Sequence, residues 1–217
     1  MDYADYVRKL RESAGGMQAS ARFHCHFTQR PGAHPDDVDD VDDMEAEIAR
    51  EEGMAGFSVP GDMKRFYTAA NGFELGWQEV RTDGRVVAGS ARLPIINAIY
   101  EPEEEMGQPR SLLYERPRLF DWTGEEDQVY MRFTRIVAEP RLFYRAQSTG
   151  REHALSLTFP EYLERLLEAR AMYPWQRFFV SDPEIRLDTA ARQAFVQDLQ
   201  RLFPETDASR FSTEGGQ

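Results

Sequence analysis

Residues 59–77 contain a short helix whose beginning, apolar face and end are all visible in the sequence. Pro60 suits the first position of a helix, because its ring fixes φ and the N–H that it lacks would have no partner there. Apolar side chains then recur every three or four residues, which places them on one helical face: Met63, Phe66, Tyr67 and Ala70. Asn71 and Gly72 follow, and both tolerate the left-handed backbone that often ends a helix. The pattern predicts a helix on a core, a tight exit and an aromatic strand.

The same stretch resembles the signature of the SUKH superfamily, the Smi/Knr-like domain. In that signature an apolar-Pro pair, a helix ending in Phe-Tyr, Asn-Gly and an aromatic strand follow one another; Val59 stands where leucine is usual. Residues 44–53 look like the leading acidic helix of the family and residues 157–167 like its closing helix, so the resemblance spans residues 38–180. It implies an α+β domain that binds proteins. Bacterial members are regarded as immunity proteins that neutralise a toxin domain, often a nuclease, and fungal members as scaffolds and regulators of cell-wall assembly.

Composition places the chain among globular proteins. The 217 residues suit one domain with appendages, and 41% of them are apolar, which is enough for a core. No apolar run reaches the roughly 18 residues that a membrane-spanning helix needs. The N-terminus has no basic segment followed by an apolar one, and Cys25 has no second cysteine with which to pair. These features predict a cytoplasmic protein without a membrane segment.

Helical patterns at both ends of the chain, with strand-like patterns between them, predict an α+β fold with a mainly antiparallel sheet flanked by helices. A first helix is expected over residues 2–13, ended by Gly15 and Gly16, and residues 21–28 fit a strand or a loop. The strand-like segments are short and separated by turn residues: 77–80, 85–88, 119–122, 128–133, 141–146 and 153–157.

Two further helices are expected after the strands. Thr158 and Glu161 form a capping box at the start of the first, whose apolar face holds Tyr162, Leu163, Leu166 and Leu167. The second covers residues 188–203, and the polar tail from Pro204 is expected to fray. We predict three parts: an N-terminal helical extension (1–34), the SUKH-like domain (35–180), and a C-terminal helix with a polar tail packed on the same domain (181–217).

The acidity of the chain is concentrated in one segment. Residues 36–52 hold ten acids and a single cation, Arg50, and so carry −9 of the total charge of −12. A helix is expected here from Pro35, with an apolar ridge of Val38, Val41, Met44 and Ile48. Such acidity argues against nucleic-acid binding and favours a basic protein partner. We predict that the partner contacts Asp36, Asp39, Asp40, Asp43 and Glu47; a merely solvated helix face is the alternative.

Motifs for catalysis, metals and cofactors are missing from the sequence. His24 and His26 would share one face of a strand with Cys25 opposite, so at most two of the three could meet at one metal ion. The segment from Asp40 fails as a calcium loop, because Met44 occupies a ligand position and the required glycine is replaced. Nucleophile elbows and phosphate-binding glycine loops are also missing.

These observations predict a non-enzyme without cofactor or metal. With the SUKH resemblance, the prediction becomes a bacterial immunity protein whose partner is a basic toxin domain. Two alternatives stay open: a scaffold or regulator without a toxin partner, and an uncharacterised hydrolase whose carboxylates the sequence does not place. The sequence gives no indication of the oligomeric state.

Overall fold

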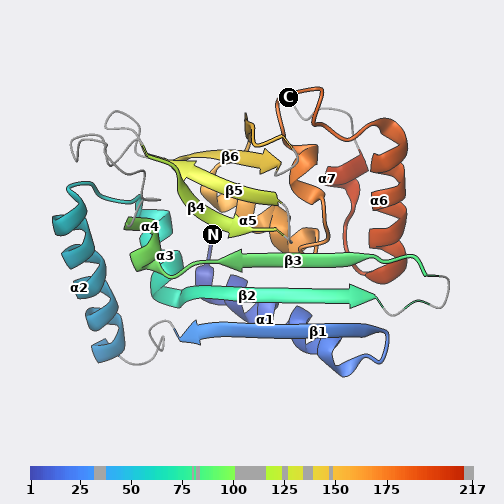
Figure 1. Cartoon of the computed structure of the whole chain (residues 1–217). Helices are drawn as coiled ribbons and strands as arrows, with labels where there is room; N and C mark the ends of the chain where they lie inside the picture. Colours follow the sequence, from blue (N-terminus) through green and yellow to red (C-terminus); the bar gives the residue numbers. More distant parts are fainter. Residues whose placement is uncertain are drawn as a thin grey trace.

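Two antiparallel sheets with helices around them make up the computed structural model of the chain, which confirms the predicted α+β class (Figure 1). Residues 1–31, 38–79, 81, 84–100, 116–123, 127–133, 139–146 and 149–212 are described; for residues 30, 31 and 38–42 the description covers the backbone alone. No helix within these ranges is long and apolar enough to span a bilayer.

The two sheets lie side by side, with β3 next to β4 (Figure 1). The first has the order β1-β2-β3, formed by Phe23–Pro31, Ala70–Glu79 and Ala88–Leu93. The second has the order β4-β5-β6-β7, formed by Arg118–Trp122, Asp127–Arg132, Arg141–Ala146 and Glu152–Ala154. Where they meet, the backbone N–H of Arg92 donates to the Asp121 carboxylate at 2.8 Å. A buried side chain therefore makes the connection that a strand ladder would otherwise make.

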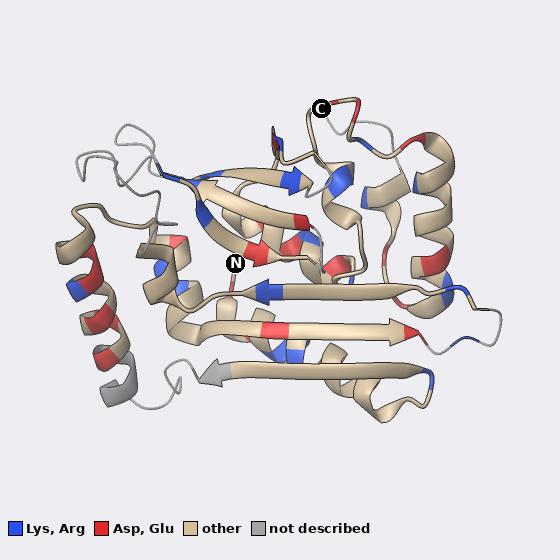
Figure 2. Cartoon of the chain, viewed as in Figure 1, with Lys and Arg blue, Asp and Glu red and all other residues tan. Residues whose placement is uncertain are grey.

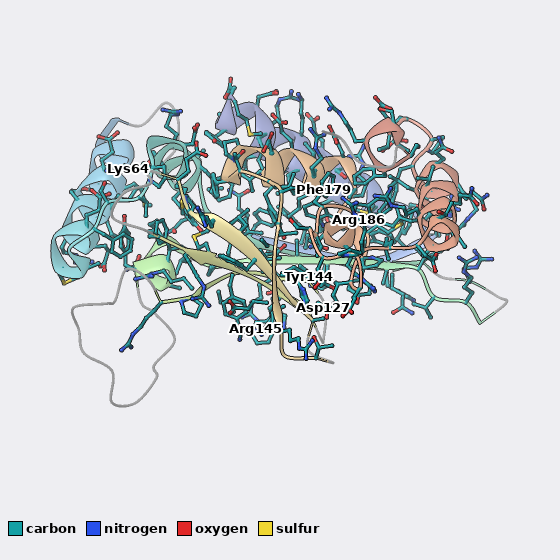
Figure 3. The ribbon with its side chains drawn as sticks, turned by 90° about the horizontal axis from the view of Figure 1, so that it is seen from above. Lys64, Asp127, Tyr144, Arg145, Phe179 and Arg186 are labelled. Carbon is teal, nitrogen blue, oxygen red and sulfur yellow. The ribbon has the colours of Figure 1, made fainter. Side chains whose placement is uncertain are left out.

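Helices cover one face of these sheets. α1 (Tyr3–Ala19), α3 (Gly61–Ala69) and α5 (Phe159–Glu168) lie behind the strands in Figure 1 and above them in Figure 3. The remaining helical segments lie at the edges: α2 (Val38–Ala55), α4 (Ile96–Tyr100), the 3₁₀ turn Trp175–Phe178, α6 (Thr189–Leu202) and α7 (Ser209–Ser212). The predicted core residues Phe66, Tyr67, Trp77, Leu163 and Leu166 are at most 3% exposed, whereas Leu167 is only partly buried.

The helix predicted within residues 59–77 is present as α3, but it ends earlier than expected: Ala70 already has an extended backbone, and Asn71 and Gly72 lie within β2. Gly72 has φ +84°, and a Cβ there would lie 2.7 Å from the carbonyl oxygens of Leu93 and Pro94. Asn71 has a role that the sequence did not show: its Oδ1 accepts the N–H of Ile96 at 2.9 Å, which holds the start of α4. Gly72 therefore allows the close approach of residues 93 and 94 to β2, and Asn71 fixes a neighbouring helix.

The prediction that the first helix ends at Gly15 and Gly16 is wrong. Asp2 caps α1, and the helix continues through both glycines to Ala19. Ala14 and Met17 on either side of the pair are at most 3% exposed. Glycine inside a helix costs about 1 kcal/mol relative to alanine, and burying flanking side chains offsets this cost.

Two further expectations need correction. The tail after Pro204 is not frayed as far as residue 212: Phe211 is fully buried, with its ring 5.4 Å from that of Phe195. The strand predicted over residues 85–88 begins only at Ala88, although the Glu79 N–H already bonds Val87 O at 2.8 Å. The short strands after residue 116, the capping box of α5 and the helix α6 are confirmed.

Candidate functional site

The acidic helix α2 lies at one edge of the molecule, next to α3 and α4 (Figure 1). Its inner side is anchored by Ile48, which is 2% exposed, and by the partly buried Met44. Figure 2 shows acidic residues recurring along the helix. Of the five predicted contact residues, Asp36 lies outside the described residues, Asp39 and Asp40 are described as helical backbone without side chains, Asp43 is exposed and Glu47 is half-buried.

The acids at the C-terminal end of α2 make contacts within the fold. The Glu52 carboxylate accepts the Val59 N–H at 3.0 Å, the Ser58 hydroxyl at 2.5 Å and the Lys64 ammonium at 2.8 Å. Burial alone would raise the pKa of Glu52, but these hydrogen bonds hold it below its ordinary value. Glu51 is 8% exposed and lies 3.2 Å from Arg50. Part of the acidic segment is therefore structural, with Lys64 on α3 as a cation that the local sequence did not show.

The outer side of α2 differs from this end. Asp43 and Glu45 are exposed and Glu47 is half-buried. Within the part of the chain that the structure describes, none of the three forms an ion pair. Asp43 and Glu47 are four residues apart on one face, where like charges repel and cost a few tenths of a kcal/mol. This repulsion has no compensating contact within the described fold, so the outer side of α2 is available for a partner.

The alternation predicted for residues 24–26 is confirmed in β1. His24 and His26 lie on the open face of the sheet, while Cys25 packs partly against the core and burial raises its pKa. The His26 ring lies directly on Gly76, where a Cβ would come within 2.1 Å of its Cε1. Among the described residues, no group of three or more His, Cys, Asp or Glu is arranged to hold a metal ion.

A row of polar and aromatic side chains crosses the open face of the first sheet. The Glu74 carboxylate lies 3.4 Å from His26 and 3.8 Å from Arg92, and the Arg92 guanidinium sits 5.8 Å from the Trp122 ring centroid. Trp122 is 38% exposed and borders a hollow of about 380 Å³. Exposed Trp and Arg are enriched among residues that dominate protein contacts. Strand order brings these residues together, and no spacing in the sequence reveals it.

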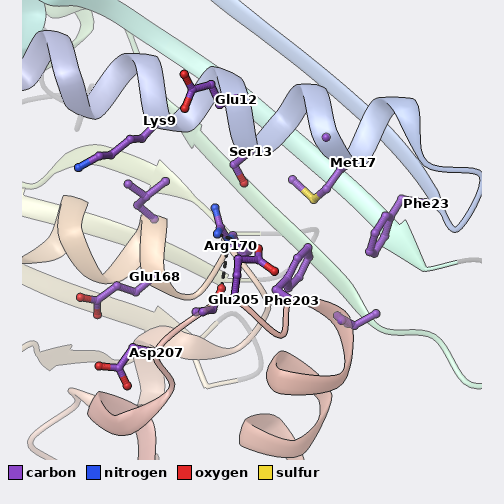
Figure 4. Close-up of a pocket in the computed structure, with 14 residues that line it drawn as sticks. Lys9, Glu12, Ser13, Met17, Phe23, Glu168, Arg170, Phe203, Glu205 and Asp207 are labelled. Atoms are coloured by element: carbon purple, nitrogen blue, oxygen red, sulfur yellow. Dashed lines mark hydrogen bonds and ion pairs between the residues drawn. The ribbon is translucent and has the colours of Figure 1, made fainter.

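A groove with a volume of about 620 Å³ lies on the helical side of the molecule (Figure 4). It lies between α1, the end of α5 and residues 202–207, and its apolar lining includes Met17, Phe23, Leu167, Leu202 and Phe203. Arg170 points into it and pairs with Glu205 at 3.0 Å. The groove can accept an apolar side chain, but it holds no nucleophile and base in contact with each other.

The backbone beside this groove is strained. Arg170 and Ala171 have φ +53° and +55°, a region that side-chain-bearing residues seldom adopt. Their carbonyl oxygens accept the Trp77 indole N–H at 2.7 Å and the Ser90 N–H at 2.9 Å. The strain is thus balanced by bonds that fasten the end of α5 to the first sheet, and it has a structural explanation.

Two buried carboxylates, Asp121 and Asp127, accept hydrogen bonds from tyrosine hydroxyls. Asp121 is fully buried and accepts the Tyr162 hydroxyl at 2.5 Å, and burial raises its pKa to about 7. Asp127, 5% exposed, accepts the hydroxyls of Tyr144 and Tyr173, and it lies close to Tyr144 in Figure 3. A catalytic acid or base must reach its substrate. Because Asp121 has no exposed surface, its role is to join the sheets.

Three exposed surfaces are thus available for binding: the outer side of α2, the open face of the first sheet and the groove of Figure 4. Of these three surfaces, the sequence predicted only that of α2. Comparison with known proteins adds no family to this description: no protein-family model, no curated protein and no solved structure matches the chain.

Proposed function

We propose that this chain is a non-catalytic protein-binding domain that neutralises a basic toxin domain, as the SUKH resemblance of residues 38–180 implies. The observation that carries the proposal is the outer side of α2. Asp43 and Glu45 are exposed there and have no ion pair among the described residues. We include Asp39, Asp40 and Glu47 of the same helix in the proposed contact surface, together with Asp36, which precedes the helix in the sequence.

An anionic helix suits this task because nuclease toxins carry basic clefts for their substrates. Complementary fields speed the encounter of two proteins and exclude partners of the wrong charge. Much of the charge of −12 lies in residues 36–52, so the field is directed from one edge of the molecule. A partner with a cationic surface would approach that edge first.

The helix is also held in place before any partner arrives. Ile48 anchors its inner side in the core, and Glu52 bonds Val59 and Lys64 beyond its C-terminal end. A surface that is already ordered loses less conformational entropy on binding. The C-terminal half of the helix is therefore fixed to the fold by contacts of its own.

The test is binding kinetics against the toxin-domain product of the gene adjacent to the one that encodes this chain. The triple variant Asp39→Asn, Asp40→Asn and Asp43→Asn should slow association about tenfold at low salt, and added salt should slow the wild type. A matched control removes three exposed acids elsewhere: Glu139→Gln, Glu164→Gln and Glu184→Gln. Equal on-rates for both variants would contradict the role of α2, and failure of the wild type to bind would overturn the toxin partner itself.

A further inference from the structure

The groove of Figure 4 combines an apolar lining with a guanidinium group that is only partly hydrogen-bonded. Its apolar side chains come from α1, β1, the end of α5 and the end of α6: Met17, Phe23, Leu167, Leu202 and Phe203. Its volume of about 620 Å³ falls within the roughly 300–1,000 Å³ of small-molecule sites, in which a few polar groups interrupt an apolar lining. The groove therefore has the size and the lining of a site for a small ligand.

Arg170 supplies the polar group of this groove. Its Nε donates to the Thr206 hydroxyl at 3.3 Å and its Nη2 to the Glu205 carboxylate at 3.0 Å, whereas Nη1 donates no hydrogen bond within the part of the chain that the structure describes. The Arg170 side chain is 18% exposed, and its burial lowers its pKa. A guanidinium carries five N–H donors in a fork that matches a carboxylate. Arg170 can therefore bind a further carboxylate on the side of Nη1.

The position of Arg170 is fixed by contacts that a ligand does not have to make. Its carbonyl oxygen accepts the Trp77 indole N–H at 2.7 Å, and its guanidinium carbon lies 5.8 Å from the centre of the Phe203 ring. Figure 4 shows the side chain extending from the end of α5 toward α1. A group that is held in place before binding loses little conformational entropy when the ligand arrives.

Four carboxylates also line the groove, and each already has a partner in the fold. These partners are Arg8 for Glu12, Arg165 for Glu168, Arg170 for Glu205, and the Ser209 N–H for Asp207. Lys9 lines the groove as well, but its side chain is 55% exposed and pairs with Asp5 at 2.8 Å. Among the charged side chains of the lining, Arg170 thus combines unused donors with a mostly buried position.

Gly16 leaves space in the groove at a position where folding alone would favour another residue. It lies inside α1, and no atom comes within 4 Å of its Cβ position. Almost any other residue has a higher helix propensity than glycine. Gly15 is equally open, but it does not line the groove. The glycine at position 16 therefore keeps the space next to Met17 available.

We propose that this groove binds a small carboxylic acid with an apolar body. The apolar body lies beside Gly16 and against Met17, Phe23 and Phe203, and the carboxylate accepts hydrogen bonds from Arg170. The site shares no residue with α2, and the inference does not depend on the toxin partner.

The experiment is an NMR titration of the isotope-labelled full chain with octanoate, octanol and octylammonium. Octanoate should bind with a Kd below about 1 mM and shift the amide signals of Gly16 and Phe23. Octanol lacks the charge and octylammonium carries the opposite one, so both should bind at least about tenfold more weakly.

Two glycine variants test the location of the site. Gly16→Leu places a side chain in the groove and should weaken octanoate binding at least about tenfold, while leucine in an open helical position should not lower the urea midpoint of unfolding. The matched control Gly15→Leu makes the same change outside the lining, and it should alter the affinity less than about twofold.

Two glutamate variants test the role of Arg170. Glu205→Gln removes the carboxylate that competes for the guanidinium and should tighten octanoate binding at least about threefold. The control Glu168→Gln changes the charge of the lining by the same amount but leaves the bond between Arg170 and Glu205 intact, so it should change the affinity less than about 1.5-fold.

Four results would each overturn the proposal. They are an absence of octanoate binding, equal binding of octanoate and either of the other two compounds, equal weakening by the two glycine variants, and equal tightening by the two glutamate variants.

Discussion

The helices α5 and α2 are both amphipathic, yet the fold depends on them to very different degrees. In α5, Phe159, Tyr162, Leu163 and Leu166 are at most 1% exposed, and a capping box fixes its start. In α2, which is almost twice as long, Ile48 and Glu51 are the buried side chains among those described. Packing accounts for the sequence of α5, whereas it leaves the outer acids of α2 unexplained. The difference supports the proposal that the outer side of α2 contacts a partner.

The largest expected effect comes from the core beneath α5. Phe66→Ala should lower the free energy of unfolding by about 3–5 kcal/mol and Leu166→Ala by about 2–5 kcal/mol, because both side chains are fully buried and leave cavities. Glu45→Ala on the exposed side of α2 should change it by less than about 0.5 kcal/mol. Urea titration measures all three. Similar losses for Leu166→Ala and Glu45→Ala would remove the contrast between the helices.

A pH titration sharpens the comparison, because α5 supplies the Tyr162 hydroxyl to Asp121. Burial raises the folded-state pKa of Asp121 to about 7 from an ordinary value of 3.8. The wild type should therefore lose stability as pH rises from about 4 to above 7, by about 4 kcal/mol from this carboxyl. Asp121→Asn should remove that loss.

Tyr162→Phe provides the control for this titration. The Tyr162 hydroxyl stabilises the charged carboxylate, so its removal should raise the pKa of Asp121 further and steepen the loss. The measurement is the midpoint of urea unfolding at several pH values. If the stability of the wild type and of Asp121→Asn changed with pH in the same way, Asp121 would not be the cause of the loss.

A smaller effect is expected at Gly72, near the start of β2. Gly72→Ala should cost about 2–4 kcal/mol, because alanine would be strained at φ +84° and would also collide with two carbonyl oxygens. Gly84→Ala separates the two causes: Gly84 has φ +78° but no atom within 4 Å of its Cβ position, so about 1 kcal/mol is expected. Equal costs would mean that the close approach to Leu93 contributes nothing.

The smallest effect concerns the acids of α2. The variant Asp39→Asn, Asp40→Asn and Asp43→Asn should leave the free energy of unfolding within about 0.5 kcal/mol of the wild type, because it removes like charges that repel along the helix. Thermal unfolding at low salt measures this. A decrease of several kcal/mol in the free energy of unfolding would show that these acids, like Glu52, stabilise the fold. It would contradict the proposal that they serve partner binding instead.

The parts of the fold that were predictable from sequence depend on neighbouring residues. The stripe that contains Phe66 and Tyr67, and the capping box of Thr158 with Glu161, involve contacts within one helix, and both predictions are confirmed. The continuation of α1 through Gly15 was not predictable, because it depends on what buries Ala14 and Met17. Tertiary burial overrides local propensity at such positions.

The candidate site was predictable to a lesser extent. The acidic segment identified α2, but its division into structural and open acids depends on Lys64 and Tyr100, which approach Glu52 from other helices. The row from His26 to Trp122 depends on strand order. The periodicity of a sequence predicts the face on which a residue lies, but it does not predict which strands become neighbours.

The contacts of Arg22 and Phe23 with the C-terminal part of the chain also affect the order in which the chain assembles during synthesis. Arg22 donates to the carbonyl oxygen of Arg201, 179 residues later, and Phe203 stacks on Phe23 at 5.5 Å and meets Trp77 at 5.4 Å. These aromatic rings stay uncovered on the ribosome until α6 has emerged. Contacts so distant in sequence form late and slowly. A nascent chain of this protein therefore exposes an apolar edge for most of its translation, when chaperones have the greatest opportunity to bind it.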